Sequence, residues 1–167
     1  MKKLTYLFLA LIIVACSSDS SDGDSGGNEQ SVCEGNSPIY LDTNGVTIKA
    51  CDDAEVYSTG VINGITYTVV NEIVLRDMIE NGDDVSKVVT TKVTDMSFMF
   101  TDNSSFNQNI SSWDVSNVTD MSGLFYETNF NQPIENWDVS NVTFMDDMFE
   151  STSFNQPIGN WDVSNVI

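Results

Sequence analysis

Three aspartates at a constant spacing are the side chains of this sequence best placed to do chemistry. Asp114, Asp138 and Asp162 each hold the second position of the motif Trp-Asp-Val-Ser-Asn-Val, and both intervals are 24 residues. Stacked about 5 Å apart, two such carboxylates repel by about 1 kcal/mol in water and by more at a lower effective dielectric. This repulsion favours a bound cation. Calcium held by these three aspartates is therefore one hypothesis, and a hydrated acidic strip is the other.

The sequence has few side chains that could support catalysis. The chain has no histidine, so the usual general base and the commonest transition-metal ligand are missing. It also lacks a Cys-His or Ser-His pair and a glycine-rich phosphate loop. A pair of carboxylates could cleave a glycosidic bond, but a repetitive ladder offers no single pocket that would hold two carboxyls in different protonation states. We predict a non-catalytic protein with no catalytic residues and, calcium apart, no cofactor.

The charge of the chain narrows the choice of partners. Asp and Glu total 25 against six Lys and Arg, which gives a formal net charge of −19. Such a surface repels nucleic acid and anionic lipid headgroups, so we expect no nucleic-acid partner. Cations, basic proteins and neutral glycans remain as candidates.

The elements that must position the aspartates belong to a repeated unit of 24 to 25 residues. Within the motif, Trp and Val alternate with Asp and Ser, which is the period of a short half-buried strand. Downstream, Met145, Met148 and Phe149 fall at i, i+3 and i+4, the spacing of apolar groups on one side of a helical turn. One unit is too small to bury its own apolar face, so successive units must stack. We predict an α+β repeat solenoid, a right-handed coil with short parallel strands and short helical turns.

In such a coil the Trp and Val side chains face the core, and the Asp and Ser side chains face solvent. The predicted binding face has six residues: Asp114, Ser116, Asp138, Ser140, Asp162 and Ser164. Tryptophan in the core is the interpretation we favour, the alternative being an exposed platform for sugar rings.

Two sets of amide side chains also recur with the repeat. The asparagines of the motif, Asn117, Asn141 and Asn165, are expected to bond to the backbone of a neighbouring unit. The Asn-Gln pairs at 107–108, 131–132 and 155–156 either pair along the stack or bind glycans, and the spacing does not decide between these roles.

The stretch FNQPIENWDVSNVTFMDDMF carries a family resemblance. It resembles the BspA-like bacterial surface proteins, whose repeats of about 25 residues are relatives of leucine-rich repeats. The resemblance covers residues 85–167. It implies a leucine-rich-repeat-like fold, placement on a cell surface and a role in adhesion.

The amino terminus predicts export and a lipid anchor. Residues 1–15 have two lysines followed by an apolar run that suits a signal peptide and is too short to span a membrane. The run ends in Ile-Val-Ala-Cys, which resembles a lipoprotein lipobox and implies that Cys16 is lipidated, with several acyl chains as a stable anchor. The alternative is a plain secretory signal followed by a chance cysteine.

Residues 16–32 form a predicted tether, because the stretch after Cys16 is rich in Ser, Asp and Gly and has no large apolar side chain. An incomplete calcium loop at Asp19, Asp22 and Asp24 is the less favoured interpretation. Acidic residues directly after a lipidated cysteine resemble the signal that routes lipoproteins of some Gram-negative bacteria to the outer face of the outer membrane. We therefore expect a surface-exposed, lipid-anchored outer-membrane protein.

Residues 33–84 are expected to cap the coil with β-hairpins and a helix. Asn44-Gly45 and Asn63-Gly64 each separate two β-rich runs, which is a strong hairpin signal. Asn71 can cap a helix that runs to about Glu80, with Gly82 as its stop.

Two further cysteines, Cys33 and Cys51, favour a disulfide in an exported chain, the alternative being separate thiols. A disulfide between them would close a loop around the first predicted hairpin. Such a loop would stabilise the fold by roughly 3 kcal/mol.

These patterns predict a cell-surface, lipid-anchored repeat protein that acts in adhesion or macromolecular recognition. Its ligand is an unidentified extracellular protein or glycan. The alternatives are a glycan-capturing component of nutrient uptake and a structural surface-layer protein. Because the predicted solenoid, 85–167, stops just after a motif, we also expect further repeats or a carboxy-terminal module beyond Ile167.

Overall fold

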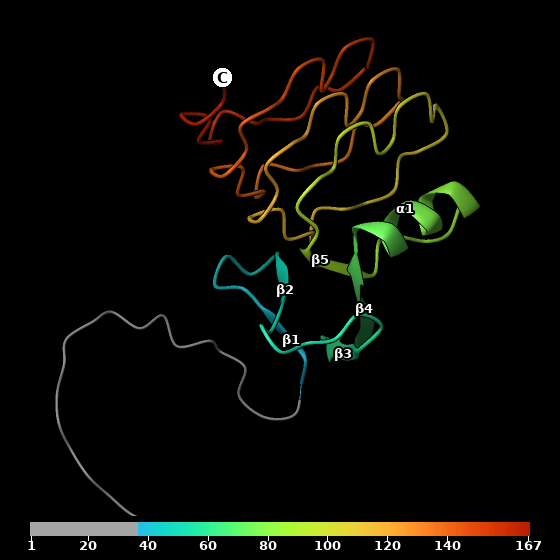
Figure 1. Ribbon diagram of the computed structural model, residues 1–167, viewed down its shortest axis with the longest axis vertical. Helices are drawn as coiled ribbons and strands as arrows, with labels where there is room; N and C mark the ends of the chain where they lie inside the picture. Colours follow the sequence, from blue (N-terminus) through green and yellow to red (C-terminus); the bar gives the residue numbers. More distant parts are fainter. Residues whose placement is uncertain (1–36) are drawn as a thin grey trace, which may run out of the picture. The chain divides into compact units, whose positions relative to one another are not determined.

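The computed structural model describes residues 37–167, which belong to one compact unit spanning Ser31–Ile167. Regular secondary structure lies in the amino-terminal part of this unit, and the rest winds in loops that lie beside one another (Figure 1). The elements are β1 (Ile39–Leu41), β2 (Ile48–Ala50), β3 (Thr59–Ile62), β4 (Ile65–Asn71), α1 (Glu72–Asn81) and β5 (Val88–Lys92).

Both hairpins predicted from Asn-Gly are present. β1 and β2 pair antiparallel, and the Asn44 side chain closes their turn by accepting hydrogen bonds from the backbone of Val46 and Thr47, each at 2.9 Å. β3 and β4 also pair antiparallel, and Asn63 and Gly64 between them have φ values of 51° and 80°. Both φ values are positive, as the tight turns favoured in hairpins require.

The predicted helix is confirmed together with both of its caps. Asn71 accepts a hydrogen bond from the Val74 N–H at 3.0 Å, and Gly82 ends the helix with φ of 74°. Leu75 is the fully buried residue of α1. After the helix the chain returns as β5, which pairs parallel with β4, so the larger sheet has the order β3-β4-β5.

The predicted leucine-rich-repeat-like solenoid is wrong as a fold class, because the described residues form small mixed sheets with one helix. Within the described chain, residues 93–167 form turns, irregular segments and two isolated parallel bridges, with no strand at any Trp-Asp-Val segment. The Asp side chain explains the difference. In the second motif, Asp138 accepts hydrogen bonds from Ser140, and the Val142 N–H donates to the Val139 carbonyl at 2.9 Å. The chain therefore turns where the alternation of residue types predicted extension.

The predicted helical turns are also wrong, because residues with positive φ interrupt them. These residues are Phe98, Gly123 and Asp147, with φ of 54°, 58° and 54°, and, four positions later, Asp102, Glu127 and Ser151, with φ of 61°, 55° and 57°. A right-handed helix needs negative φ throughout. The three Met-x-x-Met/Leu-Phe segments are therefore successions of tight turns, and we call residues 93–167 the repeat region.

One hydrophobic core joins the helix and the larger sheet to the repeat region. Equivalent rings of successive repeats lie nearly parallel within it. The Trp113 and Trp137 centroids are 6.5 Å apart, and those of Trp137 and Trp161 are 6.4 Å apart, with interplanar angles of 5° in both pairs. Phenylalanine rings form similar columns beside the indoles.

Backbone hydrogen bonds between the turn segments of neighbouring repeats run in one direction. The N–H groups of Met96, Phe98, Phe100 and Asp102 donate to the carbonyls of Asp120, Ser122, Leu124 and Tyr126 at 2.8–3.1 Å. One repeat later, the N–H groups of Met121, Gly123, Phe125 and Glu127 donate to the carbonyls of Phe144, Asp146, Met148 and Glu150 at 2.8–3.0 Å. Each segment thus presents donors toward the carboxyl-terminal side and acceptors toward the amino-terminal side.

The remaining amino-terminal predictions concern residues that the structure does not describe. The signal peptide (1–15), the lipidated Cys16, the tether (16–32) and Cys33 all lie outside residues 37–167. Cys51 is buried and disulfide-bonded. Its pairing with Cys33 stays a prediction.

Candidate functional site

The aspartates of the repeated motif share one local geometry. In each repeat the Oδ1 atom accepts a hydrogen bond from the backbone N–H of the serine two residues later, at 3.2 Å for Asp114 and 3.1 Å for Asp138 and Asp162. The serine hydroxyl also donates to Asp114 at 2.7 Å and to Asp138 at 2.6 Å. These bonds hold each carboxylate against its own turn and fix the direction in which it points.

Asp114 does not belong to an exposed face, which corrects the predicted binding surface. It is only 2% exposed, and its Oδ2 atom has no hydrogen-bond partner. The β1–β2 hairpin lies against this part of the chain, since the Ile48 N–H donates to the Ser112 carbonyl at 2.9 Å. No sequence pattern signals this contact, because the two segments lie far apart in sequence.

Lys49 supplies the charge that faces Asp114. Burial acts to lower the pKa of Lys49, but a hydrogen bond to Asp42 and the nearby charge of Asp114 raise it above its ordinary value. The Nζ atom of Lys49 lies 3.1 Å from Asp42 Oδ2. The hairpin therefore brings a cation toward the first aspartate of the series, where the sequence analysis expected solvent or calcium.

Asp138 and Asp162 are exposed and keep the predicted orientation toward solvent. The hydrogen bonds from the Ser164 side chain and backbone hold the pKa of Asp162 below its ordinary value, so this carboxylate stays charged in mildly acidic solution. Ser140 is half-buried and Ser164 is exposed beside them. Ser116 is half-buried, and its hydroxyl is bonded to the buried Asp114. What remains of the predicted face is Asp138, Ser140, Asp162 and Ser164, and we call these four residues the acidic face.

The motif asparagines have the structural role that was predicted. Asn117 donates to the Thr91 carbonyl at 2.9 Å, and Asn141 and Asn165 donate to the carbonyls of Ser116 and Ser140, each at 2.7 Å. Every one of these bonds reaches the preceding layer of the chain.

The Asn-Gln pairs, whose role was left open, also bond along the repeats. The Asn131 N–H donates to Asn107 Oδ1 at 3.0 Å, and the Asn155 N–H donates to Asn131 Oδ1 at 2.9 Å. The side-chain carbonyls of Asn107 and Asn131 are thus occupied within the fold. This leaves fewer free amides for a glycan than the sequence suggested.

The tryptophans are core residues and not a platform for sugars, as predicted. Trp113 and Trp137 are buried, and each indole Nε1 donates to a backbone carbonyl of the preceding layer. Trp161 makes the same bond to the Ile134 carbonyl at 3.2 Å but is half-buried.

Residues 37–167 contain no cluster of three or more histidine, cysteine or acidic side chains that is arranged to hold a metal ion. The burial of Asp114 beneath the hairpin also separates it from the exposed Asp138 and Asp162. Calcium at these three aspartates therefore stays a hypothesis that rests on sequence spacing alone.

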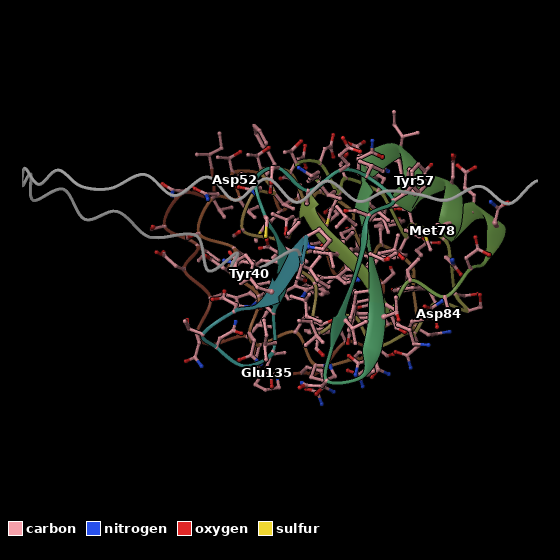
Figure 2. All side chains as sticks on the ribbon, turned by 90° about the horizontal axis from the view of Figure 1, so that it is seen from below. Tyr40, Asp52, Tyr57, Met78, Asp84 and Glu135 are labelled. Atoms are coloured by element: carbon pink, nitrogen blue, oxygen red, sulfur yellow. The ribbon has the colours of Figure 1, made fainter. Side chains whose placement is uncertain are left out.

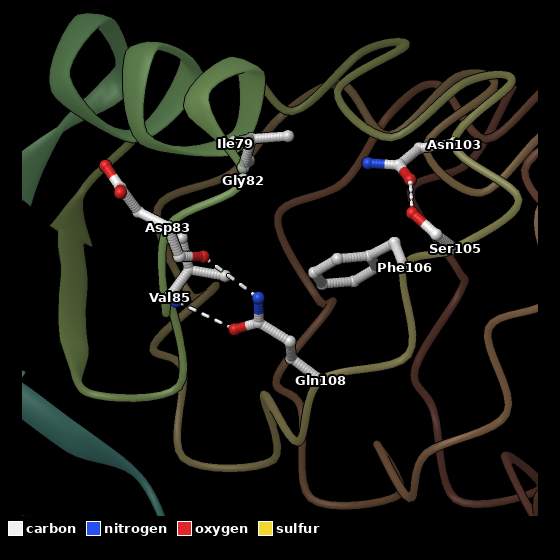
Figure 3. A pocket seen from close by; sticks show the side chains of 8 residues that line it. All are labelled: Ile79, Gly82, Asp83, Val85, Asn103, Ser105, Phe106 and Gln108. Atoms are coloured by element: carbon white, nitrogen blue, oxygen red, sulfur yellow. Dashed lines mark hydrogen bonds between the residues drawn. The ribbon is translucent and has the colours of Figure 1, made fainter.

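A small pocket of about 210 Å³ lies where the end of α1 meets the first repeat (Figure 3). Gln108 is fixed in it, because its amide accepts a hydrogen bond from the Val85 N–H at 2.8 Å and donates to the Asp83 carbonyl at 2.9 Å. On one side of the pocket, the Ser105 hydroxyl donates to Asn103 Oδ1 at 2.8 Å. Asp83 is the one titratable side chain of the lining, so the pocket offers polar contacts but no acid–base pair.

A second hollow, of about 370 Å³, lies beside α1 and β4. Tyr57, Met78 and Asp84, which line it, gather on the α1 side of the molecule, whereas Tyr40 lies on the side of β1 (Figure 2). Its floor includes Val70 and Val88, and its rim carries the Lys87–Asp84 ion pair at 3.2 Å. This lining is open and largely apolar, without a nucleophile next to a base.

Membrane attachment was predicted through lipid on Cys16, outside the described residues. Within residues 37–167, α1 is the single helix, and neither it nor any other segment there forms a helix with the length and hydropathy to span a bilayer.

Comparison with known proteins gave one match, to a protein family. A family model described as "Mycoplasma protein of unknown function, DUF285" matches residues 71–167. The match begins at the cap of α1 and includes the acidic face. Curated proteins and solved structures provide no match. The resemblance to BspA-like proteins therefore stays a prediction.

Proposed function

The chain belongs to the DUF285 family, which is described only as Mycoplasma protein of unknown function, and we propose that this member is a non-catalytic surface protein that recognises an extracellular macromolecule. The recognition surface is the acidic face, Asp138, Ser140, Asp162 and Ser164. The preferred ligand is a protein with a basic surface. Lipid on Cys16 anchors the protein in the outer membrane, and the tether at 16–32 separates the folded unit from the bilayer.

The observation that carries this proposal is the repeated hydrogen bonding of the motif. Asp138 and Asp162 are held by the same serine N–H contact at the same distance of 3.1 Å, on turns whose tryptophans stack 6.4 Å apart. Two carboxylates with fixed direction and regular spacing lose little conformational entropy when a ligand binds. The net charge of −19 adds long-range attraction for a basic partner.

A binding experiment with matched variants tests the recognition surface. The full chain is titrated with a polylysine peptide and, separately, applied to an array of neutral glycans. We expect saturable polylysine binding that weakens with salt, and roughly tenfold weaker binding for the double variant Asp138→Asn/Asp162→Asn. The control is Asp52→Asn/Asp53→Asn, which removes the same charge from two exposed residues outside the face.

An equal loss of polylysine affinity in both double variants would mean that binding depends only on net charge, and the acidic face would then have no specific role. Strong glycan binding that the Asp138→Asn/Asp162→Asn variant keeps would favour the glycan-capture alternative. Self-association of the full chain at high concentration without any ligand would favour a surface-layer role.

The anchor is tested independently of the ligand. Cells that express the full chain are labelled with a palmitate analogue, and the label is expected on the wild-type protein and absent from Cys16→Ser. A labelled Cys16→Ser variant, or an unlabelled wild type, would contradict the anchor.

A further inference from the structure

The hollow beside α1 and β4 combines an apolar floor with polar groups around it. Its volume of about 370 Å³ lies at the lower end of the range, ~300–1,000 Å³, that small-molecule sites occupy. Val70 and Val88 line it and are buried, and Val74 and Met78 of α1 add half-buried apolar side chains. We call this hollow the Tyr57 pocket, after the aromatic residue that lines it.

Tyr57 has a backbone conformation that its residue type rarely adopts. Its φ is 72°, and a bulky residue with positive φ is strained. The ring gains little from burial in return, because the residue is 68% exposed. Strain of this kind is common at sites that hold ligands. It points to a role for the Tyr57 side chain beyond the stability of the fold.

Backbone hydrogen bonds fix this conformation at the start of the β3–β4 pair. The Tyr57 N–H donates to the Val69 carbonyl at 2.8 Å, and the Val69 N–H donates to the Ser58 carbonyl at 2.9 Å. The Ser58 hydroxyl also donates to the Glu55 carbonyl at 2.6 Å. The phenol ring therefore stands on a fixed backbone, and a ligand does not have to order this segment when it binds.

Three hydroxyl groups of the lining are available to a ligand. They belong to Tyr57, Thr66 and Thr68, and none of these hydroxyl groups makes a hydrogen bond to another group of residues 37–167. Thr66 and Thr68 alternate along β4, so their side chains project from the same face of the sheet. Each hydroxyl can donate one hydrogen bond and accept others.

The charged groups of the lining balance each other. Lys87 Nζ lies 3.2 Å from Asp84 Oδ2, and the Ser86 N–H donates to Asp84 Oδ1 at 3.0 Å. Hydrogen bonds from Ser86 and Lys87 hold the pKa of Asp84 below its ordinary value, so this carboxylate stays an acceptor near neutral pH. A lining with one anion and one cation favours a neutral ligand with many hydrogen-bonding groups over an ion.

A pyranose sugar has the properties that this lining selects. The C–H groups of the ring form an apolar face that packs against an aromatic ring, and the hydroxyl groups project around its edge. A purely apolar ligand would instead cover the hydroxyls and the ion pair without offering them hydrogen bonds, which is unfavourable.

We propose that the Tyr57 pocket binds one neutral hexopyranose ring, with the Tyr57 ring against one face of the sugar and the two threonine hydroxyls bonded at its edge. The sugar is bound and not cleaved, because the lining has no nucleophile next to a base. This site shares no residue with the acidic face, so the inference goes beyond the proposed function and does not depend on it.

Ligand-observed nuclear magnetic resonance tests the pocket. The full chain is titrated with methyl α-glucoside, methyl α-mannoside and methyl β-galactoside, and saturation transfer to the sugar protons is followed. We expect saturable binding of at least one glycoside, with a dissociation constant on the order of 1 mM that is unchanged by salt. Binding of one ring at this strength is distinct from the strong array binding that would favour glycan capture.

Substitutions at Tyr57 separate a binding role from a structural one. Tyr57→Gly is expected to weaken glycoside binding roughly tenfold but to melt no lower than the wild type, because glycine adopts positive φ without strain. Tyr57→Phe keeps the ring and is expected to bind within about threefold of the wild type. The control is Phe98→Ala, which removes another aromatic residue with positive φ, 62% exposed and outside the pocket, and should leave binding unchanged.

The double variant Thr66→Val/Thr68→Val removes the hydroxyls, keeps the shape of the side chains and is expected to weaken binding roughly tenfold. Asp138→Asn/Asp162→Asn is expected to keep glycoside binding, and Tyr57→Gly is expected to keep polylysine binding. Failure of this proposal is therefore distinguishable from failure of the proposed function.

The proposal is overturned if none of the glycosides binds saturably or if Tyr57→Gly binds them as the wild type does. It is also overturned if benzyl alcohol displaces the glycosides at equal concentration, because the pocket would then select apolar rings. Unchanged binding in Thr66→Val/Thr68→Val would overturn it as well, and that comparison leaves Tyr57 in place.

Discussion

Asp114, Asp138 and Asp162 have the same sequence neighbours but different surroundings. Hairpin β1–β2 covers the first aspartate and brings Lys49 toward it, whereas the other two face solvent. Identical motifs therefore contribute differently to stability. The buried Asp114 depends on its few hydrogen-bond partners in the protein, whereas Asp138 and Asp162 can replace their hydrogen bonds with bonds to water.

Replacing Asp114 and Asp138 one at a time measures this difference. We expect Asp114→Ala to lower the free energy of unfolding by about 1–3 kcal/mol, because it leaves the Ser116 hydroxyl without its acceptor and removes a negative charge near Lys49. Asp138→Ala is the matched control and should cost less than about 1 kcal/mol. Urea unfolding followed by tryptophan fluorescence provides both values. Equal losses would mean that the hairpin does not cover Asp114 in solution.

The Asp42–Lys49 ion pair makes stability depend on pH. Burial acts to raise the pKa of Asp42, but hydrogen bonds from Lys49 and Thr43 outweigh it and hold the pKa below the ordinary 3.8. A carboxyl whose pKa is lower in the folded state stabilises the fold above its unfolded pKa. This stabilisation begins to be lost as the pH falls to 3.8, and it is fully lost once the pH is below the lowered pKa of Asp42 in the folded protein.

We therefore expect the free energy of unfolding to fall as the pH drops from about 5 to below 3. Lys49→Met should flatten the part of this slope that Asp42 causes. Lys92→Met, which removes a lysine whose Nζ donates to a backbone carbonyl at 3.4 Å, should keep the slope. Urea titrations at a series of pH values compare the three proteins, and parallel curves for wild type and Lys49→Met would contradict the assignment.

The residues of the predicted binding face illustrate what a motif conveys. The alternation of Trp and Val with Asp and Ser correctly predicted buried indoles and the exposure of Asp138 and Asp162. It could not predict the burial of Asp114, because that depends on a hairpin more than 60 residues earlier in the chain.

At the scale of the elements, the turn segments of the repeat region depend on residues that accept positive φ. Gly123 has φ of 58°, and a Cβ built on it would lie 2.4 Å from the ring of Phe98. Phe98 is 62% exposed and occupies the equivalent position one repeat earlier. The absence of a side chain at Gly123 thus makes room for a phenylalanine ring across the boundary between repeats.

Gly123→Ala should destabilise the protein by about 1–3 kcal/mol, through the contact with Phe98 and the strained φ. The control is Gly159→Ala, since a Cβ at Gly159 meets nothing within 4 Å. The double variant Gly123→Ala/Phe98→Ala should recover part of the loss, because it removes the steric conflict but not the backbone strain. Thermal unfolding of the four proteins tests this, and a neutral Gly123→Ala would show that the segment adjusts easily.

Elements with strong local signals were predictable, and those set by tertiary contacts were not. Asn63-Gly64 and the Asn71 cap encode their turns within a few residues, and both appear as expected. The Met-x-x-Met/Leu-Phe spacing fits a helical turn as well as it fits the tight turns that the structure shows. Positive φ at Phe98 and Asp147 prevents that helix, and a phenylalanine does not signal such a conformation in sequence.

At the scale of the whole molecule, one core cluster extends from Val70 through α1 to Met148. The helix and the repeat region therefore share one core, whereas hairpin β1–β2 packs on a second, smaller cluster with Val69 and Val89. Trp137→Ala should lower the free energy of unfolding by about 3–5 kcal/mol, because it removes a buried indole from the middle of this cluster. Trp161→Ala should cost less, since Trp161 is half-buried.

A shared core also predicts a single unfolding transition. Far-ultraviolet circular dichroism reports mainly on the sheets and α1, and tryptophan fluorescence reports on the repeat region. The two signals should change together with urea in the wild type and in Trp137→Ala. Two separated transitions would contradict a core shared by α1 and the repeat region.

The ladder of indoles has an optical consequence. Neighbouring indoles lie 6.4–6.5 Å apart and within 5° of parallel. The Nε1 atoms of Trp113, Trp137 and Trp161 donate to the equivalent carbonyls of Val85, Ile110 and Ile134. The transition dipoles of the indoles are thus aligned, so the excitation energy of one indole can pass along the ladder with little loss of polarisation. The light emitted from the solvent-facing end then reports on chromophores hidden two layers below.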